Sequence, residues 1–215
     1  MIIAVDGPAA AGKGTLARRI ARHYGLEYLD TGALYRAVGL AMTRAGLDPH
    51  DEAAAERTAR GLELPLRDEE ALRTAAAGEA ASIVAAIPGV RAALLDLQRD
   101  FAARPPGAVL DGRDIGTVVC PEADIKLFVD ASPRVRARRR WKELRDRGED
   151  AGFEDILAQV RARDVRDSQR AEAPLARAED AHLLDTSKLD IEAAFRAARQ
   201  IIDARIQEGS GRRGS

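Results

Sequence analysis

Cysteine is almost absent from this chain of 215 residues. Cys120 is alone, so no internal disulfide can form, and we expect it to be a small buried residue in a reducing compartment. Long apolar segments are also missing, because none approaches the ~20 residues that span a bilayer. The first residues, MIIAVDGPAA, have no basic segment ahead of an apolar one, so we expect no signal peptide. Together these features predict a cytoplasmic protein that does not enter a membrane.

Lysine is rare as well. It accounts for only four of the 34 basic residues, at Lys13, Lys126, Lys142 and Lys188, and arginine supplies the rest. Arginine can bind a phosphate with two parallel hydrogen bonds, which lysine cannot, although biased codon usage explains an arginine-rich composition equally well. The formal net charge is −1, so no overall field attracts nucleic acid, and we expect small-molecule partners. The positions of the arginines must therefore decide what they do.

Short apolar segments alternate with amphipathic ones along most of the chain. We expect strands at 2–5, 26–29, 108–110, 125–129 and 182–184. We expect helices at 15–24, 33–44, 133–147, 153–170 and 191–206. This alternation predicts an α/β fold with a parallel sheet that is flanked by helices, in which ligands bind at the carboxyl ends of the strands.

The stretch from 48 to 104 differs from the rest, because it is rich in alanine and charged residues and has no strong strand pattern. Residues 62–66 are a weak strand candidate, and 83–87 and 90–101 have helical patterns. We therefore predict a core made of 1–47 and 105–208, a mainly helical insertion at 48–104, and a disordered tail at 209–215.

A glycine-containing segment lies between the first strand and the first helix, where a phosphate-binding loop must lie. Its residues are Gly7, Pro8, Ala9, Ala10, Ala11, Gly12, Lys13, Gly14 and Thr15. Its backbone N–H groups and the helix N-terminus would bind the phosphates of ATP, and a solvated Lys13 would reach the β- and γ-phosphates. The alternative is a glycine-rich turn without a ligand.

The scarcity of histidine helps to decide whether the acceptor of the phosphoryl group is a hydroxyl or a phosphate. His23, His50 and His182 are the only histidines, and none is in a convincing position for a general base. A hydroxyl acceptor benefits from a base, whereas a phosphate acceptor, with a second pKa near ~6, is already deprotonated at neutral pH. Such an acceptor needs clamping and charge neutralisation, which arginines provide. Candidates for this clamp are Arg36, Arg113, Arg163 and Arg170.

Five segments together resemble the bacterial cytidylate kinases, a family of nucleoside monophosphate kinases. They are VDGPAAAGKGT near the start, LDTGALYR at 29–36, ASIVAAIPGVR at 81–91, LDGRDIGTVV at 110–119 and RDVRDSQRAEAPL at 163–175. The resemblance implies transfer of the γ-phosphoryl of ATP to CMP or dCMP. It also implies a P-loop NTPase-type sheet, an NMP-binding insertion, a short lid within about 133–152, and a monomer.

The resemblance also implies roles for individual residues. Ser82, Arg91 and Asp114 would read cytosine, whose amino group donates and whose N3 and O2 accept. Arg163 and Asp167 would hold the sugar hydroxyls. The CMP phosphate would be bound by Thr31, Arg36, Arg113 and Arg170. Catalysis would fall to Lys13, Arg113 and two lid arginines, Arg138 and Arg139, while the other arginines of 134–140 would be solvated.

Some alternatives stay open. Thr15 and Asp111 are candidates to hold Mg²⁺, Asp111 through water, although Asp111 could simply cap a turn. A kinase that also accepts UMP, or a nucleotide-dependent switch with no acceptor site, are the competing functions. The segment 62–73 is shorter than in the family and lacks its strand-rich hairpin, which leaves the shape of the insertion undetermined.

Overall fold

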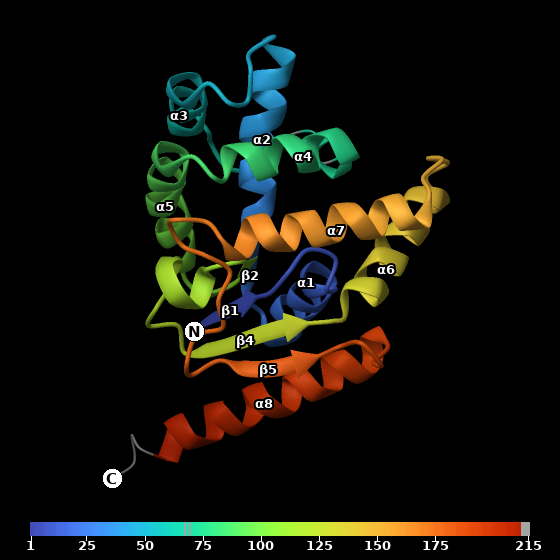
Figure 1. Cartoon of the computed structure of the whole chain (residues 1–215). Coiled ribbons are helices and arrows are strands. Elements are labelled where there is room, and N and C mark those ends of the chain that lie inside the picture. Colours follow the sequence, from blue (N-terminus) through green and yellow to red (C-terminus); the bar gives the residue numbers. More distant parts are fainter. Residues whose placement is uncertain (67, 69, 212–215) are drawn as a thin grey trace. The chain divides into compact units, whose positions relative to one another are not determined.

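The computed structural model describes residues 1–66, 68 and 70–211 (Figure 1). The chain forms two compact units. The first, here called the core unit, contains Met1–Tyr28 and Pro105–Ser215, and the second, the helical unit, contains Leu29–Arg104. The second unit thus begins at Leu29 rather than at residue 48, because the helix that follows Leu29 packs with the helices of the insertion.

A five-stranded sheet carries the site. Its strands are β1 (Ile2–Asp6), β2 (Glu27–Asp30), β3 (Ala108–Gly112), β4 (Ile125–Asp130) and β5 (His182–Asp185), in the order β2-β3-β1-β4-β5. The pairs β1–β3, β1–β4 and β4–β5 are parallel. All five expected strands are confirmed to within one or two residues. Since parallel strands end at the same edge, the loops after β1, β3, β4 and β5 emerge together.

Helices α1 (Lys13–Tyr24) and α8 (Ile191–Gly211) pack on the core-unit sheet. Apolar residues of α1 at helical spacing bury against the strands, and Gly25 ends the helix with a φ of 65°. The main core contains Ile3, Val5, Leu16, Ile20, Val109, Leu127 and Ile202. Helix α8 continues to Gly211, three residues into the segment for which disorder is expected, and 212–215 lie outside the described residues.

Two further helices of the core unit, α6 (Pro133–Asp146) and α7 (Phe153–Ser168), pack against each other. A second apolar cluster joins them, formed by Ala137, Leu144, Ile156, Leu157 and Val160. These helices agree with the expected 133–147 and 153–170 apart from one or two residues at their ends. A π-helical turn at Ile115–Val119, after β3, has no counterpart among the expected elements.

The helical unit contains α2 (Thr31–Arg44), α3 (Glu52–Arg60), a short 3₁₀ turn (Ala71–Arg73), α4 (Ala75–Val84) and α5 (Pro88–Ala102). Side chains of Asp30, Asp51 and Thr74 cap α2, α3 and α4 by accepting a backbone N–H. No strand forms at 62–66. The helix expected at 83–87 is formed only at 83–84, because α4 ends at Val84 and the chain turns before Pro88 opens α5, which confirms the helix expected at 90–101.

Within the described part of the chain, no single helix has the length and apolar composition to cross a membrane. The helices Ala76–Val84 and Pro88–Ala102 together have the length and apolar composition of a membrane span, but the chain bends by 100° between them.

Candidate active site

The phosphate-binding loop is held by hydrogen bonds to its carbonyl oxygens. Lys13 Nζ donates to the Pro8 carbonyl at 3.1 Å, and Arg136 Nη1 donates to the Ala9 carbonyl at 3.3 Å. The Ala11 carbonyl accepts from Arg139 Nη1 and from the Thr186 hydroxyl, each at 3.0 Å. Because a trans peptide points its N–H opposite to its carbonyl, these bonds turn the following N–H groups away from the donors. Such a loop is suited to binding an anion through its backbone.

The loop backbone has unusual conformations that two glycines permit. Gly7 has a φ of 146°, and a Cβ there would lie 1.9 Å from the Val129 carbonyl oxygen, so no other residue fits. Gly12 has a φ of 91°. Ala10, however, has a φ of 60°, which costs an alanine about 1–3 kcal/mol. The surrounding contacts must therefore hold this residue in place.

Lys13 is buried, with 6% of its surface exposed, so the expectation that it is solvated is wrong. Its ammonium folds back onto the loop and donates to the Pro8 carbonyl. It also lies close enough to Asp6 to lower the pKa of that carboxyl. The lysine is therefore preorganised at the loop and is not mobile in solvent.

Asp111, near the end of β3, is also buried. Its Oδ2 accepts a hydrogen bond from the Tyr28 hydroxyl at 2.7 Å. A Cβ at Gly14 would lie 3.2 Å from that oxygen and 3.5 Å from the phenol. The usual hydroxyl residue after Lys13 is thus replaced by glycine where this carboxylate approaches the helix start, and the exposed Thr15 provides the hydroxyl one position later.

The donor set fits a magnesium ion that keeps most of its own ligands. The described residues contain no group of three or more His, Cys, Asp or Glu side chains able to hold a metal. Mg²⁺ usually keeps several waters and binds substrate phosphates with one or two carboxylates. A single buried carboxylate, Asp111, beside a phosphate-binding loop is compatible with that mode.

Asp6, the last residue of β1, is a buried functional candidate that the sequence reasoning missed. Its two carboxylate oxygens accept from the backbone N–H groups of Ile115 at 2.8 Å and Gly116 at 2.7 Å. Burial raises its pKa to about 6, against the lowering effect of these bonds and of Lys13. An acidic residue at the end of a buried strand, directly before the loop, was the available signal. This side chain ties the loop strand to the turn after Asp114.

Several predicted acceptor residues lie together in the core unit. Arg113 Nε donates to Asp167 Oδ2 at 2.9 Å, and Arg170 Nε donates to the Asp167 main-chain carbonyl at 3.4 Å. Burial would raise the pKa of Asp167, but the charges of Arg113, Arg163 and Arg170 lower it below its usual value. The positive charges of three arginines therefore act on one buried carboxylate.

Asp114 is buried and begins the π-helical turn, where its main-chain carbonyl accepts from the N–H groups of Val118 at 2.9 Å and Val119 at 3.1 Å. Its charge contributes to the raised pKa of Asp6. The turn thus holds the backbone of Asp114, two residues after the end of β3. Asp6 in turn anchors the turn through Ile115 and Gly116.

The arginines of α6 differ in environment. Arg138 is exposed. Arg139 donates from Nη2 to the Thr186 carbonyl at 2.7 Å and from Nη1 to the Ala11 carbonyl, and burial lowers its pKa. Arg136 is 3% exposed, so the expectation that it is solvated is wrong. It pairs with Asp164 of α7 through two bonds, of 2.8 and 2.6 Å.

The helical unit holds the other predicted acceptor residues. Arg36 donates to Asp30 at 2.6 Å, and Arg91 lies within 3.5 Å of the Tyr35 hydroxyl. The Ser82 hydroxyl is buried without a hydrogen-bond partner among the described residues, as is Arg36 Nε. Thr31 is buried at the start of α2. A buried polar atom without a partner is costly, and a polar ligand would satisfy it.

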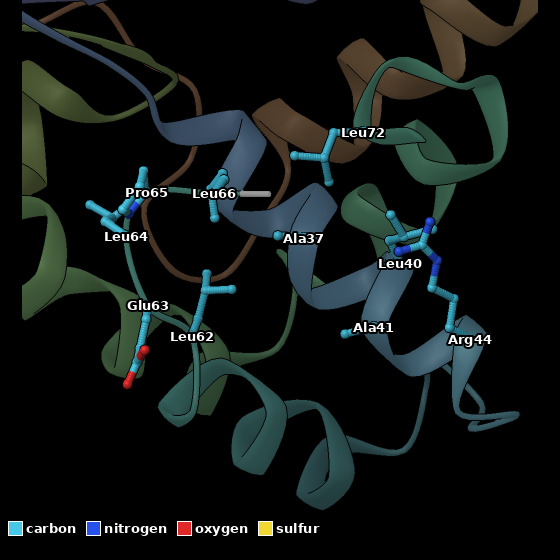
Figure 2. Close-up of a pocket in the computed structure, with 10 residues that line it drawn as sticks. All are labelled: Ala37, Leu40, Ala41, Arg44, Leu62, Glu63, Leu64, Pro65, Leu66 and Leu72. Carbon is cyan, nitrogen blue, oxygen red and sulfur yellow. The ribbon is translucent and has the colours of Figure 1, made fainter. Parts of the chain in front are cut away.

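An apolar cavity of about 410 Å³ also lies in the helical unit (Figure 2). On one side it is lined by α2, at Ala37, Leu40, Ala41 and Arg44, and on the other by 62–66 and Leu72. None of the predicted site residues lines it. The segment for which a weak strand was considered therefore packs as an irregular loop over α2.

Solved structures share this fold. An uncharacterised protein from Eubacterium ventriosum matches with a TM-score of 0.55 and 14% identity, over 94% of this chain and 98% of that one. Shikimate kinase from Bacteroides thetaiotaomicron matches with a TM-score of 0.52 and 13% identity, over the same shares. At these identities the likeness confirms the expected α/β fold and carries no information on the substrate.

Comparisons of sequence are more specific. The family model described as cytidylate kinase matches residues 3–204. A cytidylate kinase of Xanthobacter autotrophicus is 64% identical over 205 residues, which cover 95% of this chain and 98% of the relative. One from Caulobacter vibrioides is 60% identical over 207 residues, which cover 96% and 97%. The resemblance drawn from five segments of the sequence is thereby confirmed, and the chain belongs to the cytidylate kinase family.

Proposed function

We propose that the chain transfers the γ-phosphoryl of ATP to CMP or dCMP and releases ADP with CDP or dCDP. The observation that carries this proposal is the cluster of Arg113, Arg163 and Arg170 around Asp167. A nucleotide-dependent switch has no use for a second cationic site, whereas a phosphate acceptor requires one. Membership in the cytidylate kinase family supports the same reaction.

On this proposal the donor phosphates bind at the loop of residues 7–15. Loop N–H groups and the N-terminus of α1 receive the α- and β-phosphates, and Lys13 neutralises charge that develops on the transferring group. The loop is already braced through its carbonyls, so little reorganisation is needed when ATP binds.

The acceptor phosphate attacks without help from a general base, since it is deprotonated at neutral pH. Arg36, Arg113 and Arg170 hold it, with Thr31 beside them, and Arg163 and Asp167 hold the sugar hydroxyls. Arg138, which is exposed, and Arg139, which contacts the Ala11 carbonyl and Thr186, are the candidate lid arginines. Clamping of this kind supplies most of the catalysis in phosphoryl transfer.

Cytosine is read by a carboxylate and by donors. Asp114 accepts from the amino group, and Arg91 and Ser82 serve the ring acceptors. Uracil carries an acceptor oxygen at position 4 and a donor N–H at N3, the reverse of cytosine, so each mismatched group would cost ~1–3 kcal/mol. The buried Ser82 hydroxyl supports this assignment, because it has no hydrogen-bond partner among the described residues.

Mg²⁺ would be held by Asp111 through water and by Thr15, and it would neutralise charge on the β- and γ-phosphates. Tyr28 orients the Asp111 carboxylate for this role. The expectations that the protein is a cytoplasmic monomer, and that it binds neither nucleic acid nor membranes, stay predictions.

Two substitutions test the acceptor site. Asp167→Ala should reduce kcat/KM by at least about tenfold, with effects on CMP and dCMP that differ in size, because the sugars differ at the 2′ position. Arg170→Ala should reduce both equally, because both substrates carry the same phosphate. Kinetics with both nucleotides and melting temperatures check this. Near-normal kinetics with a large loss of stability would return these residues to a structural role.

A further inference from the structure

Arg136 is the most deeply buried charged side chain of α6. Its guanidinium donates from Nε to the Ala131 carbonyl at 2.7 Å, from Nη1 to the Ala9 carbonyl, and from Nη1 and Nη2 to the two oxygens of Asp164. One planar group thus joins the residue that follows β4, the phosphate-binding loop and α7. Lysine cannot replace it, because an ammonium has no fixed fork and no Nε donor.

The contact with Ala9 lies beside the strained residue of the loop. Ala10 has a φ of 60°, in the left-handed region that alanine avoids. The peptide joining Ala9 to Ala10 is trans, so its N–H points opposite to the carbonyl that Arg136 binds. When Arg136 holds that carbonyl, it also fixes the direction of the Ala10 N–H and opposes rotation of this peptide away from the strained conformation.

We infer that Arg136 is a positioning residue for the donor phosphates, which holds the loop at Ala9 so that the Ala10 N–H faces them, and that Asp164 locks Arg136 in place. The inference rests on the proposed function, since it takes the loop to bind a nucleoside di- or triphosphate. Arg136 acts through the loop backbone and does not touch the nucleotide.

The salt bridge between Arg136 and Asp164 connects the phosphate-binding loop to α7, the helix that carries the predicted acceptor residues Arg163 and Asp167. Asp164 follows Arg163 directly on α7, and Asp167 lies one turn further along the same helix. The salt bridge is asymmetric, because the Arg136 side chain is 3% exposed and that of Asp164 is 28% exposed. The arginine is therefore the member that depends on the pair, and loss of the carboxylate would leave a buried charge poorly compensated.

The test measures ADP binding by isothermal titration calorimetry in Arg136→Met, Arg136→Lys and Asp164→Asn. Each should weaken ADP binding by at least about fivefold, the size of the strain that the brace offsets. Arg145→Met is the matched control, since Arg145 lies on the same helix, is exposed, and has its guanidinium over the Trp141 ring. Its affinity should stay within twofold of that of the unmodified chain.

A second substitution distinguishes an effect of Arg136 on the loop conformation from an effect on the stability of the whole protein. Glycine adopts a positive φ without strain, so Ala10→Gly combined with Arg136→Met or Arg136→Lys should recover most of the lost ADP affinity. It should not restore any loss in melting temperature. If Arg136→Met fails to fold, Arg136→Lys, which keeps the charge, carries the same comparison.

Two outcomes would overturn the inference. One is ADP affinity that is unchanged in both Arg136→Lys and Asp164→Asn. The other is a loss that follows the melting temperature and is not recovered by Ala10→Gly. Failure of the unmodified chain to bind ADP is a separate result, which would overturn the proposed function itself together with the inference.

Discussion

At the scale of single residues, burial and hydrogen bonding compete at Asp6. Burial raises its pKa from 3.8 to about 6, and the bonds from Ile115 and Gly116 lower it only in part. Between about pH 4 and pH 6 the native state therefore binds a proton that the unfolded state has lost. Stability must fall as the pH rises through this interval and become independent of this group above it.

This sign gives a prediction for Asp6→Asn. The unmodified chain should lose free energy of unfolding relative to the variant between about pH 4 and pH 6, by up to about 3 kcal/mol, and the difference should be constant at higher pH. Urea unfolding of both proteins across that range measures it. A difference that does not vary with pH would contradict the raised pKa.

Gly14 makes a second residue-scale prediction. In Gly14→Ala the new methyl would lie 3.2 Å from Asp111 Oδ2, so the carboxylate must move by a few tenths of an ångström and its position on Tyr28 changes. We expect a several-fold higher Mg²⁺ concentration for half-maximal activity. The melting temperature should change by no more than about 3 °C, because alanine favours the helix by about 1 kcal/mol. Unchanged Mg²⁺ dependence would remove Asp111 from the metal site.

The environments of some single residues could not be predicted from the sequence. The loop motif predicts that Lys13 serves phosphates, but it carries no signal for the burial of Lys13 or for its bond to the Pro8 carbonyl. The five arginines between 134 and 140 look alike in sequence. Only the packing of α6 on α7 separates the buried Arg136 from the exposed Arg138. Asp6 has no motif of its own, and its role follows from a turn that is distant in sequence.

At the scale of elements, the crossing of α2 and α4 depends on Gly39. A Cβ there would lie 2.7 Å from Ala80 Cβ and 2.9 Å from the Ala80 carbonyl carbon. Gly39→Ala should cost about 1–3 kcal/mol and lower the melting temperature by several degrees. It should raise KM for CMP, since α2 carries Arg36 and α4 carries Ser82, and it should leave KM for ATP near normal.

Gly78 of α4 provides the matched control, because a Cβ there meets nothing within 4 Å. Gly78→Ala should raise stability by up to about 1 kcal/mol through helix propensity alone. If both alanine variants shift the melting temperature in the same direction, the close approach of α2 and α4 at Gly39 is not what stabilises this unit.

The regular elements could be predicted well and the irregular ones poorly. The five strands and the helices of the core unit follow from apolar periodicity, which tertiary packing reinforces. The π-helical turn at Ile115–Val119 has no local signal, because Asp6 supplies the acceptors for its first N–H groups. In the alanine-rich insertion, where periodicity is weak, the boundaries of α4 were wrong and α3 was expected only as general helical character.

At the scale of the whole molecule, each unit carries part of the predicted chemistry. The core unit contains the phosphate-binding loop and the Asp167 cluster, and the helical unit contains Arg36, Ser82 and Arg91. With a net charge of −1, attraction to phosphate must come from these local groups and not from an overall field. The two competing functions differ in their acceptor: a nucleotide-dependent switch has no acceptor, and a kinase of broader specificity also accepts UMP.

The most direct measurement is the rate of ADP release from ATP with CMP, dCMP, UMP, AMP or GMP, or with no acceptor. We expect rapid release with CMP and dCMP, at least about tenfold lower kcat/KM with UMP, and background rates with AMP, GMP and no acceptor. Equal rates with CMP and UMP would contradict cytosine recognition. Slow ATP hydrolysis that no nucleoside monophosphate accelerates would contradict the kinase and favour the switch.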